Sequence, residues 1–348
     1  MDTNSYYSDD IHGPYSLFNL GDFDLESGSC LRGAKLAYAT FGSLNPLKDN
    51  AVLFPTWYSG TSKIIQQAYI GKGRALDPDK YFIIVANQLG NGLSSSPQNT
   101  PLPANGGAFP KISIADDVRA QCKLITDAFG ISKLELVLGG SMGAQQTYEW
   151  AVRYPDMVKR AAPIAGTARA TLHNKLLVQT FKDAISSDPN WDGGWYKHGA
   201  AVHRGLRRHA HLFAASGFSP KLYASEGWRS IGFSSVDDFV TNFVEAHFLP
   251  QDPNNLLLML NKWQNGDVSR ATGGCLKTAL GNITARVAVI AIEEDNFFPL
   301  ADITAEQRMI PNSELRLVSS EWGHLALFGV DPGYNATVDS HLKTLLAT

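Results

Sequence analysis

The sequence predicts an α/β fold in which a mostly parallel central sheet carries helices on both faces. Short apolar runs alternate along the chain with segments of helical periodicity. The runs at 81–87 and 286–292 are almost wholly apolar, which is typical of strands buried on both faces. A chain of 348 residues with 44% hydrophobic content can bury a large core and carry an insertion within one domain.

The individual elements follow from local patterns, after an N-terminal arm around His12 that we expect to be irregular. Apolar runs predict strands at 35–41, 51–54, 81–87, 134–138, 160–164, 286–292 and 314–319. Helical spacing predicts helices at 114–129, 144–154, 236–248 and 254–263, and a terminal helical run around His341.

The stretch between 165 and 283 differs from the rest of the chain. It contains six of the nine histidines and four tryptophans, and helical segments replace the strand-like runs. We therefore expect a core domain of residues 1–165 and 284–348, with a helical cap inserted at 166–283. A cap excludes water and shapes a substrate pocket; the alternative is a packing layer with no role in selection.

A Gly-x-Ser-x-Gly turn follows the run at 134–138. Gly139 and Gly143 flank Ser141 at the two positions where a strained strand-to-helix turn needs small residues. The helix that follows directs its positive N-terminal end toward the serine. This context predicts that Ser141 is a nucleophile; the alternative is a glycine-rich turn that contains a serine by chance.

A serine nucleophile needs a general base and a group that orients the base. In hydrolytic enzymes with this turn the partners follow in the order Ser, Asp or Glu, His, each just past a later strand. Asp295 follows the strand at 286–292, and we place it ahead of Glu293 and Glu294 because it lies deepest in its loop. His324 follows the last predicted strand and is the expected base.

Acyl chemistry at a serine also needs donors for the negative oxygen of a tetrahedral intermediate. The backbone N–H of Met142, directly after the serine, is one expected donor. The second is expected from the loop after the strand at 51–54, where Tyr58 or Trp57 would donate its backbone N–H. The rings of Trp57 and Tyr58 would then line the substrate pocket, or would pack against the cap instead.

Composition excludes several classes of partner and site. The net charge is -3 and the lysines and arginines are dispersed, so no nucleic-acid partner is expected. Three widely separated cysteines favour free thiols in a reducing compartment, and neither a targeting peptide nor a membrane span is expected. His209 and His211 lack a further ligand at a recognisable spacing, so we expect no metal site. We therefore expect a cytoplasmic protein without a cofactor.

Several longer motifs resemble one enzyme family. They are NAVLF at 50–54, FPKISIADDVRAQ at 109–121, GGSMGAQQ at 139–146, DPNWDGGWY at 188–196, DNFFP at 295–299 and GH at 323–324. From about Ala34 to Gly329 the chain resembles the homoserine O-acetyltransferase family of α/β-hydrolases. The resemblance implies an α/β-hydrolase fold, a catalytic triad of Ser141, Asp295 and His324, and oxyanion donors at Met142 and Tyr58. It also favours Asp295 over the two glutamates, and a homodimer.

The chain departs from the transferase pattern around the expected site. It has Thr56-Trp57-Tyr58 where those enzymes have His-Ala-Leu, Ala144 where they have Gly, and Leu325 where they have Asp. A Gly-Leu-Ser-Ser-Ser run at 92–96 stands where they have Gly-Ser-Thr-Gly-Pro.

The expected anchor for an amino-acid carboxylate is also missing. His209-Ala210 stands where the transferases have an alanine followed by the arginine that holds this carboxylate. Loss of a bidentate anchor lowers amino-acid specificity, although Arg207 or Arg208 is an alternative anchor. The pattern is closer to the esterase branch of the family.

Three functional hypotheses follow. The first is a serine carboxylesterase that cleaves small, acetate-type acyl esters through an acyl-serine intermediate, with water as the second nucleophile. The second is an O-acyltransferase that moves an acetyl or other acyl group from acyl-CoA to homoserine or another alcohol. The third is a hydrolase fold reused as a binding protein, which the complete Ser, Asp and His set argues against.

Overall fold

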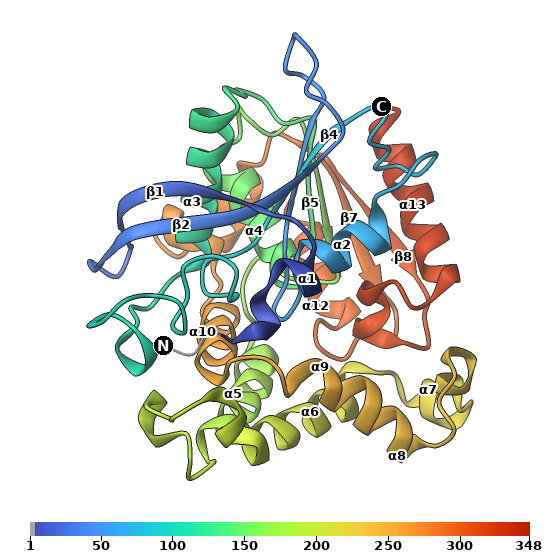
Figure 1. Ribbon diagram of the computed structural model, residues 1–348. Helices are drawn as coiled ribbons and strands as arrows, with labels where there is room; N and C mark the ends of the chain where they lie inside the picture. Colours follow the sequence, from blue (N-terminus) through green and yellow to red (C-terminus); the bar gives the residue numbers. More distant parts are fainter. Residues whose placement is uncertain (1–3) are drawn as a thin grey trace.

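An eight-stranded sheet forms the centre of the molecule (Figure 1), and the computed structural model describes residues 4–348. The strands lie side by side in the order β1-β2-β4-β3-β5-β6-β7-β8. Their bounds are Ser16–Asp24 (β1), Cys30–Phe41 (β2), Ala51–Pro55 (β3), Phe82–Ala86 (β4), Leu136–Gly140 (β5), Arg160–Ile164 (β6), Arg286–Ile292 (β7) and Ser313–Val318 (β8).

The sheet is parallel from β4 through β3 to β8, and antiparallel only at the edge formed by β1 and β2. Every residue of β3, β4, β5 and β6 is buried, as expected for parallel strands that are covered on both faces. The predicted α/β fold with a mostly parallel sheet is thus confirmed.

Helices cover both faces of this sheet. Figure 1 shows α3 (Ile114–Lys123) and α4 (Met142–Arg153) on one side, and α2 (Ser62–Tyr69) and α13 (Pro332–Leu346) on the other. A short helix, α12 (Leu300–Gln307), connects β7 to β8. No helix within residues 4–348 is long and apolar enough to cross a bilayer.

A layer of helices lies between β6 and β7 in the sequence and below the sheet in Figure 1. We call residues 172–281 the helical layer. Its α-helices are Leu172–Ser186 (α5), His203–Gly217 (α6), Pro220–Ala224 (α7), Val236–Phe239 (α8), Ala246–Phe248 (α9), Pro253–Gln264 (α10) and Leu276–Gly281 (α11). This layer is the helical insertion that the sequence predicts; its division from the core at residues 165 and 284 stays a prediction.

The expectation of an irregular N-terminal arm is wrong. Residues Asp9–His12 form a short helix, α1, and β1 is the edge strand of the sheet. Most of β1 is exposed or half-buried, and register shifts on both sides of Gly21, which has a φ of +69°, interrupt its alternation. An exposed, bulged edge strand therefore lacks the apolar run by which the buried strands are recognised.

The predicted helix at 114–129 is also irregular toward its end. The α-helical part stops at Lys123, and Leu124–Ala128 forms a π-helical turn. A similar turn, Val240–Glu245, joins α8 to α9, so the predicted helical stretch at 236–248 is continuous but not uniform.

Candidate active site

Ser141 occupies the turn between β5 and α4. Its backbone has φ 55° and ψ −120°, a region that non-glycine residues rarely adopt and that costs free energy. The turn is tight on both sides, because a Cβ atom at Gly139 would lie 2.4 Å from the Gly143 carbonyl oxygen, and one at Gly143 would lie 2.7 Å from that of Pro55. The two glycines let β5 and α4 approach closely enough to present the serine side chain.

Three side chains from the ends of three strands meet at this turn. The Nε2 atom of His324 lies 2.9 Å from Ser141 Oγ, and its Nδ1 atom lies 2.7 Å from Asp295 Oδ2. Asp295 follows β7 and His324 follows β8, as predicted from the sequence. This chain of contacts is the arrangement in which a histidine takes the proton of a serine while a carboxylate orients the imidazole ring.

The carboxylate of Asp295 is fixed by the backbone of its own loop. The N–H groups of Phe297 and Phe298 donate to Asp295 Oδ1 at 2.7 and 3.0 Å, which leaves Oδ2 for the histidine. The two rival carboxylates are placed elsewhere. Glu294 pairs with Lys221 at 2.9 Å and with the residues after β8, and Glu293 is exposed.

Two aromatic rings enclose the imidazole of His324. The centroids of Phe297 and Phe298 lie 4.6 and 5.6 Å from that of His324. Ser141 and His324 are only 2% and 3% exposed. A site this dry strengthens the electrostatic interactions of a charged intermediate.

The loop of residues 55–61, which we call the oxyanion loop, runs beside Ser141. Side-chain amides of Gln88 and Gln146 donate to the Thr56 carbonyl at 2.6 and 3.0 Å. The Gly60 N–H donates to the Trp57 carbonyl at 3.3 Å. Because the C=O and N–H of a trans peptide point in opposite directions, these bonds also set the directions of the Trp57 and Tyr58 N–H groups.

The expected oxyanion donors are not used elsewhere. Within residues 4–348, the backbone N–H groups of Trp57, Tyr58 and Met142 donate to no protein acceptor. Met142 is the first residue of α4, where a helix leaves its N–H groups free for a ligand. Both alternatives for the loop donor, Trp57 and Tyr58, therefore stay open.

The rings of Trp57 and Tyr58 point in different directions. The Tyr58 hydroxyl lies 3.1 Å from His209 Nε2, and its ring packs against Phe213 and Trp263 of the helical layer. The Trp57 ring packs within the core against Tyr69, and against Phe328. Both residues are nearly fully buried. A role for either ring in substrate binding stays a prediction.

Tyr58 and His209 are both departures from the transferase pattern, which has leucine and alanine at these positions. They lie 151 residues apart in the sequence, but their side chains are in contact with each other.

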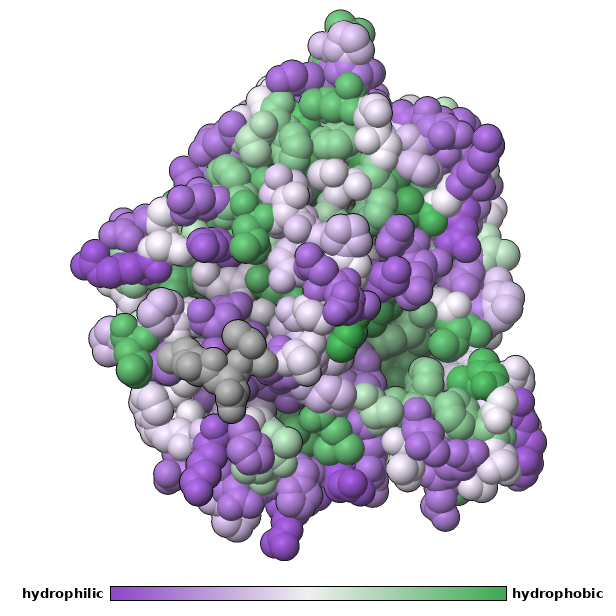
Figure 2. All heavy atoms as spheres, viewed as in Figure 1, coloured by the Kyte–Doolittle hydropathy of each residue, from purple (hydrophilic) through white to green (hydrophobic). Residues whose placement is uncertain are grey.

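An apolar pocket of about 250 Å³ adjoins the candidate site. Figure 2 shows hydrophobic surface in a hollow at the boundary between the core and the helical layer. The wall includes Leu325, the residue after His324, and consists of Phe213, Asn242, Phe243, Val244, His247, Phe248, Leu325 and Phe328. The sequence motifs did not identify this pocket, because its wall comes from separate segments of the chain.

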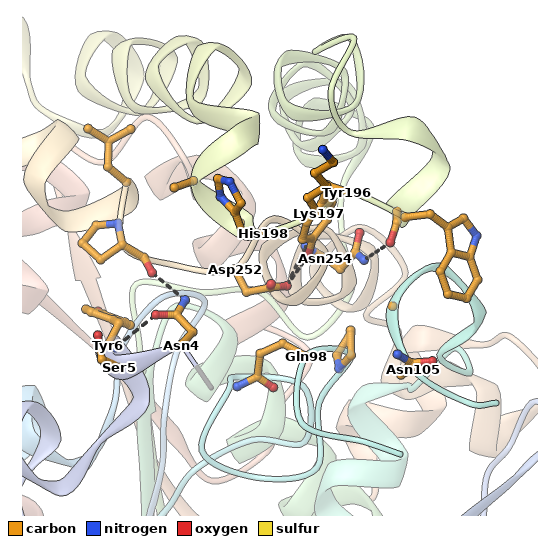
Figure 3. A pocket seen from close by; sticks show the side chains of 18 of the residues that line it. Asn4, Ser5, Tyr6, Gln98, Asn105, Tyr196, Lys197, His198, Asp252 and Asn254 are labelled. Carbon is orange, nitrogen blue, oxygen red and sulfur yellow. Dashed lines mark hydrogen bonds between the residues drawn. The ribbon is translucent and has the colours of Figure 1, made fainter. Parts of the chain in front are cut away.

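A second hollow, of about 690 Å³, is more polar and lies apart from Ser141 (Figure 3). It lies between the N-terminal residues and the loops that carry Gln98, Asn105 and Tyr196. Two hydrogen bonds lie in its wall, since the Tyr196 hydroxyl donates to Asp252 at 2.7 Å and Asn254 donates to the Gly194 carbonyl at 2.9 Å. None of Ser141, Asp295 and His324 belongs to its wall.

The alternative carboxylate anchors are engaged at the surface. Arg207 pairs with Glu245 at 3.1 Å, and Arg208 donates to Ser187 and to the Arg204 carbonyl. Neither arginine lines the apolar pocket.

His209 and His211, which were considered as metal ligands, have different surroundings. His209 is buried against Tyr58, while the exposed His211 contacts Glu245 at 2.8 Å. No cluster of three or more metal-ligating side chains occurs in the part of the chain that the structure describes.

Comparisons with known proteins support the α/β-hydrolase fold. Residues 60–329 match the family model for the alpha/beta hydrolase fold. The chain is 53% identical to an ethyl acetate hydrolase of Pseudomonas veronii over 345 residues, which cover 99% of each protein. It is 32% identical to a homoserine O-acetyltransferase of Nostoc punctiforme over 338 residues, covering 91% of this chain and 93% of that protein. The crystal structure of an acetylester hydrolase from Corynebacterium glutamicum matches with a TM-score of 0.99 and 49% identity, covering 100% of both chains.

Proposed function

The chain belongs to the α/β-hydrolase family, and from this membership we propose that it is a serine esterase that hydrolyses small acetate esters. The observation that carries the proposal is the hydrogen-bonded chain from Ser141 through His324 to Asp295. The relatives at about half identity are named as hydrolases of ethyl acetate and of acetyl esters, which supports acetate as the acyl group.

In the first half of the reaction, Ser141 Oγ attacks the ester carbonyl carbon while His324 Nε2 takes the hydroxyl proton. The carbonyl oxygen becomes negative and accepts hydrogen bonds from the backbone N–H groups of Met142 and of Tyr58 or Trp57. One such donor contributes roughly 10²- to 10³-fold to kcat in enzymes of this kind. The C–O bond to the alcohol then breaks, and His324 returns the proton to the leaving alcohol.

In the second half, water attacks the acetyl-serine while His324 takes a proton from the water. A second tetrahedral intermediate forms at the same donors and releases acetate, and the proton returns to Ser141 Oγ. Asp295 accepts a hydrogen bond from the Nδ1–H of His324 in both halves, which keeps Nε2 free to exchange protons.

The apolar pocket provides a place for the alkyl part of the alcohol. Its wall includes Leu325, next to the base, and His247, whose Nε2 lies 2.9 Å from the hydroxyl of Ser59 in the oxyanion loop. A volume of about 250 Å³ accommodates a short alkyl chain.

The test compares purified wild-type enzyme with Ser141→Ala on p-nitrophenyl acetate, and then on acetyl-CoA with homoserine. We expect acetate release by the wild type, a loss of about 10⁴-fold or more in kcat for Ser141→Ala, and no O-acetylhomoserine. O-acetylhomoserine as the main product would identify a transferase, and inactivity with both substrate sets would favour a binding protein. The exposed residue His203 offers a control variant, His203→Asn, which should keep full activity.

A further inference from the structure

Three hydroxyl groups of the oxyanion loop each contact a histidine. The distances between the hydroxyl oxygens and the ring nitrogens are 3.1 Å for Tyr58 with His209, 2.9 Å for Ser59 with His247 and 3.0 Å for Thr61 with His12. The three histidines come from α6, α9 and α1 respectively, so all three contacts reach the loop from outside the sheet.

The rings are kept neutral by burial. Desolvation lowers the pKa of His209 to about 3 and that of His247 to about 4, and it also lowers the pKa of His12. A neutral imidazole has one donor and one acceptor nitrogen, and a hydroxyl group can serve either one. Each contact is therefore a hydrogen bond between two neutral groups near pH 7.

The two ends of the loop are held by different groups. Core side chains hold the first part through Thr56, whose carbonyl accepts from Gln88 and Gln146. The histidines hold the part that begins at Tyr58. The loop is folded tightly between these supports, because a Cβ atom at Gly60 would lie 2.4 Å from Trp57 Nε1. A shift at Tyr58 or Ser59 therefore has little room to be absorbed within the loop.

We propose that His209 and His247 are positioning residues that hold the oxyanion loop from the helical layer, so that its backbone N–H points at the reacting carbonyl oxygen. This inference rests on the proposed esterase function. It explains why polar pairs are buried where apolar side chains would fill the same space: a hydrogen bond fixes a direction, which an apolar contact does not. The histidines act through the loop and touch no reacting atom.

The decisive experiment uses two substitutions at His247 that differ in one property. Glutamine places a hydrogen-bonding nitrogen near the position of Nε2, whereas leucine fills similar space without it. We expect kcat for p-nitrophenyl acetate to fall about tenfold or more in His247→Leu and to recover largely in His247→Gln. Because His247 also lines the apolar pocket, KM is compared in Ser59→Ala, where it should change less than about twofold. Ser59→Ala removes the other partner of the same contact and should reproduce the loss.

A transition-state analogue separates positioning from general stability. The serine oxygen adds to the carbonyl carbon of trifluoroacetone, and the ketone oxygen becomes an anion that accepts hydrogen bonds from the oxyanion donors. Its inhibition constant should weaken in His247→Leu and Ser59→Ala by the same factor as kcat/KM falls. Tyr58→Phe should show the same parallel loss through the contact with His209, and His203→Asn, on the same helix as His209, should show none.

The outcomes are distinct. If His247→Leu and Ser59→Ala lower only the unfolding temperature and keep wild-type kcat and trifluoroacetone affinity, the histidines have a structural role alone and the inference is wrong. If His247→Leu does not fold, Ser59→Ala and Tyr58→Phe decide in its place. If the wild type hydrolyses no acetate ester, the proposed function fails, whatever the variants do.

Discussion

The two halves of the candidate site are supported by different parts of the molecule. Ser141, Asp295 and His324 each lie past the end of a strand of the central sheet, β5, β7 and β8 respectively, and they contact one another at that edge of the sheet. The oxyanion loop follows β3, but its hydroxyl groups contact α1, α6 and α9. The triad residues belong to the core, whereas two of the three histidines that contact the oxyanion loop belong to the helical layer.

This difference assigns separate tasks to the two regions. A helical layer that only covered the site would affect substrate entry and KM. A layer that holds the oxyanion loop also affects kcat, because the donors act only in the transition state. A further contact links the helical layer to the oxyanion loop. Lys262 of α10 donates to Asp117 at 2.6 Å and to Gln88 at 2.9 Å, and the Gln88 side chain donates to the Thr56 carbonyl.

The largest effect is expected in the core half. Asp295→Asn should lower kcat by about 10³- to 10⁴-fold with little change in unfolding temperature, because the amide favours the wrong tautomer of His324. Steady-state kinetics on p-nitrophenyl acetate measures this loss. Glu294→Gln is the matched control and should keep activity within about threefold, since Glu294 contacts Lys221 rather than the histidine. Equal losses in the two variants would contradict the assignment of Asp295.

The next effect concerns the buried ion pair of Lys262 with Asp117, which joins the helical layer to the core. Lys262 and Asp117 are both fully buried, and burial raises the pKa of Asp117 to about 6 while it lowers that of Lys262. Lys262→Met leaves the carboxyl group of Asp117 without its partner, so we expect the free energy of unfolding to fall by about 3–5 kcal/mol.

Urea denaturation measures this change, and Lys159, an exposed lysine that pairs with Glu135, provides the control. Lys159→Met should cost less than about 1 kcal/mol, because water screens the lysine and Glu135 keeps its pair with Arg160. If the two lysine variants lose equal stability, the buried contact does not tie the helical layer to the core.

A pH effect follows from the low pKa of His209. In the unfolded chain this histidine takes up a proton near pH 6.5, whereas in the folded protein it does so only near pH 3. Between these values the unfolded state binds more protons, so the stability falls as the pH falls. From pH 7 to pH 5 this residue alone should lower the free energy of unfolding by about 2 kcal/mol.

Urea denaturation of the wild type and His209→Gln at pH 7, 6 and 5 isolates this contribution. Other titrating groups cancel in the difference, so the variant should lose less stability than the wild type on acidification. His203→Asn should follow the wild type, because His203 is exposed. Parallel curves for wild type and His209→Gln would show that His209 titrates normally in the folded protein.

The smallest effect is expected at the apolar pocket. Phe243 forms part of its wall, so Phe243→Leu should enlarge the pocket and raise the ratio of butyl acetate to ethyl acetate hydrolysis roughly three- to tenfold. Phe233 packs on Phe243 but lies outside the wall, and Phe233→Leu should leave that ratio unchanged. A change in kcat without a change in the ratio would assign Phe243 to loop support rather than to alcohol selection.

Much of the fold was predictable from the sequence because buried parallel strands are apolar at nearly every position. The strands β6 and β7 have the bounds that their apolar runs predicted. The edge strand β1 was missed because its side chains are largely exposed and its register is interrupted at Gly21. Regular burial leaves a pattern in the sequence, and an exposed edge does not.

Part of the candidate site was likewise predictable from the sequence, and part was not. Ser141, Asp295 and His324 were identified because each lies in the segment that follows a strand, and parallel topology brings such strand ends to one edge of the sheet. The contact of His247 with Ser59 joins residues 188 positions apart, and its geometry depends on how α9 packs on the core. No spacing or composition in the sequence indicates such a contact, so it was found only in the structure.

The N-terminal segment has a practical consequence for protein engineering. Asn4 donates to the Pro250 carbonyl at 2.9 Å, the Tyr7 hydroxyl accepts from the Asp252 N–H at 2.9 Å, and His12 contacts Thr61. Figure 1 shows α1 between the sheet and the helical layer. Deletion of residues 4–12 would remove one support of the oxyanion loop, so truncated versions should lose turnover before they lose their fold. Affinity tags and fusion partners therefore belong after α13.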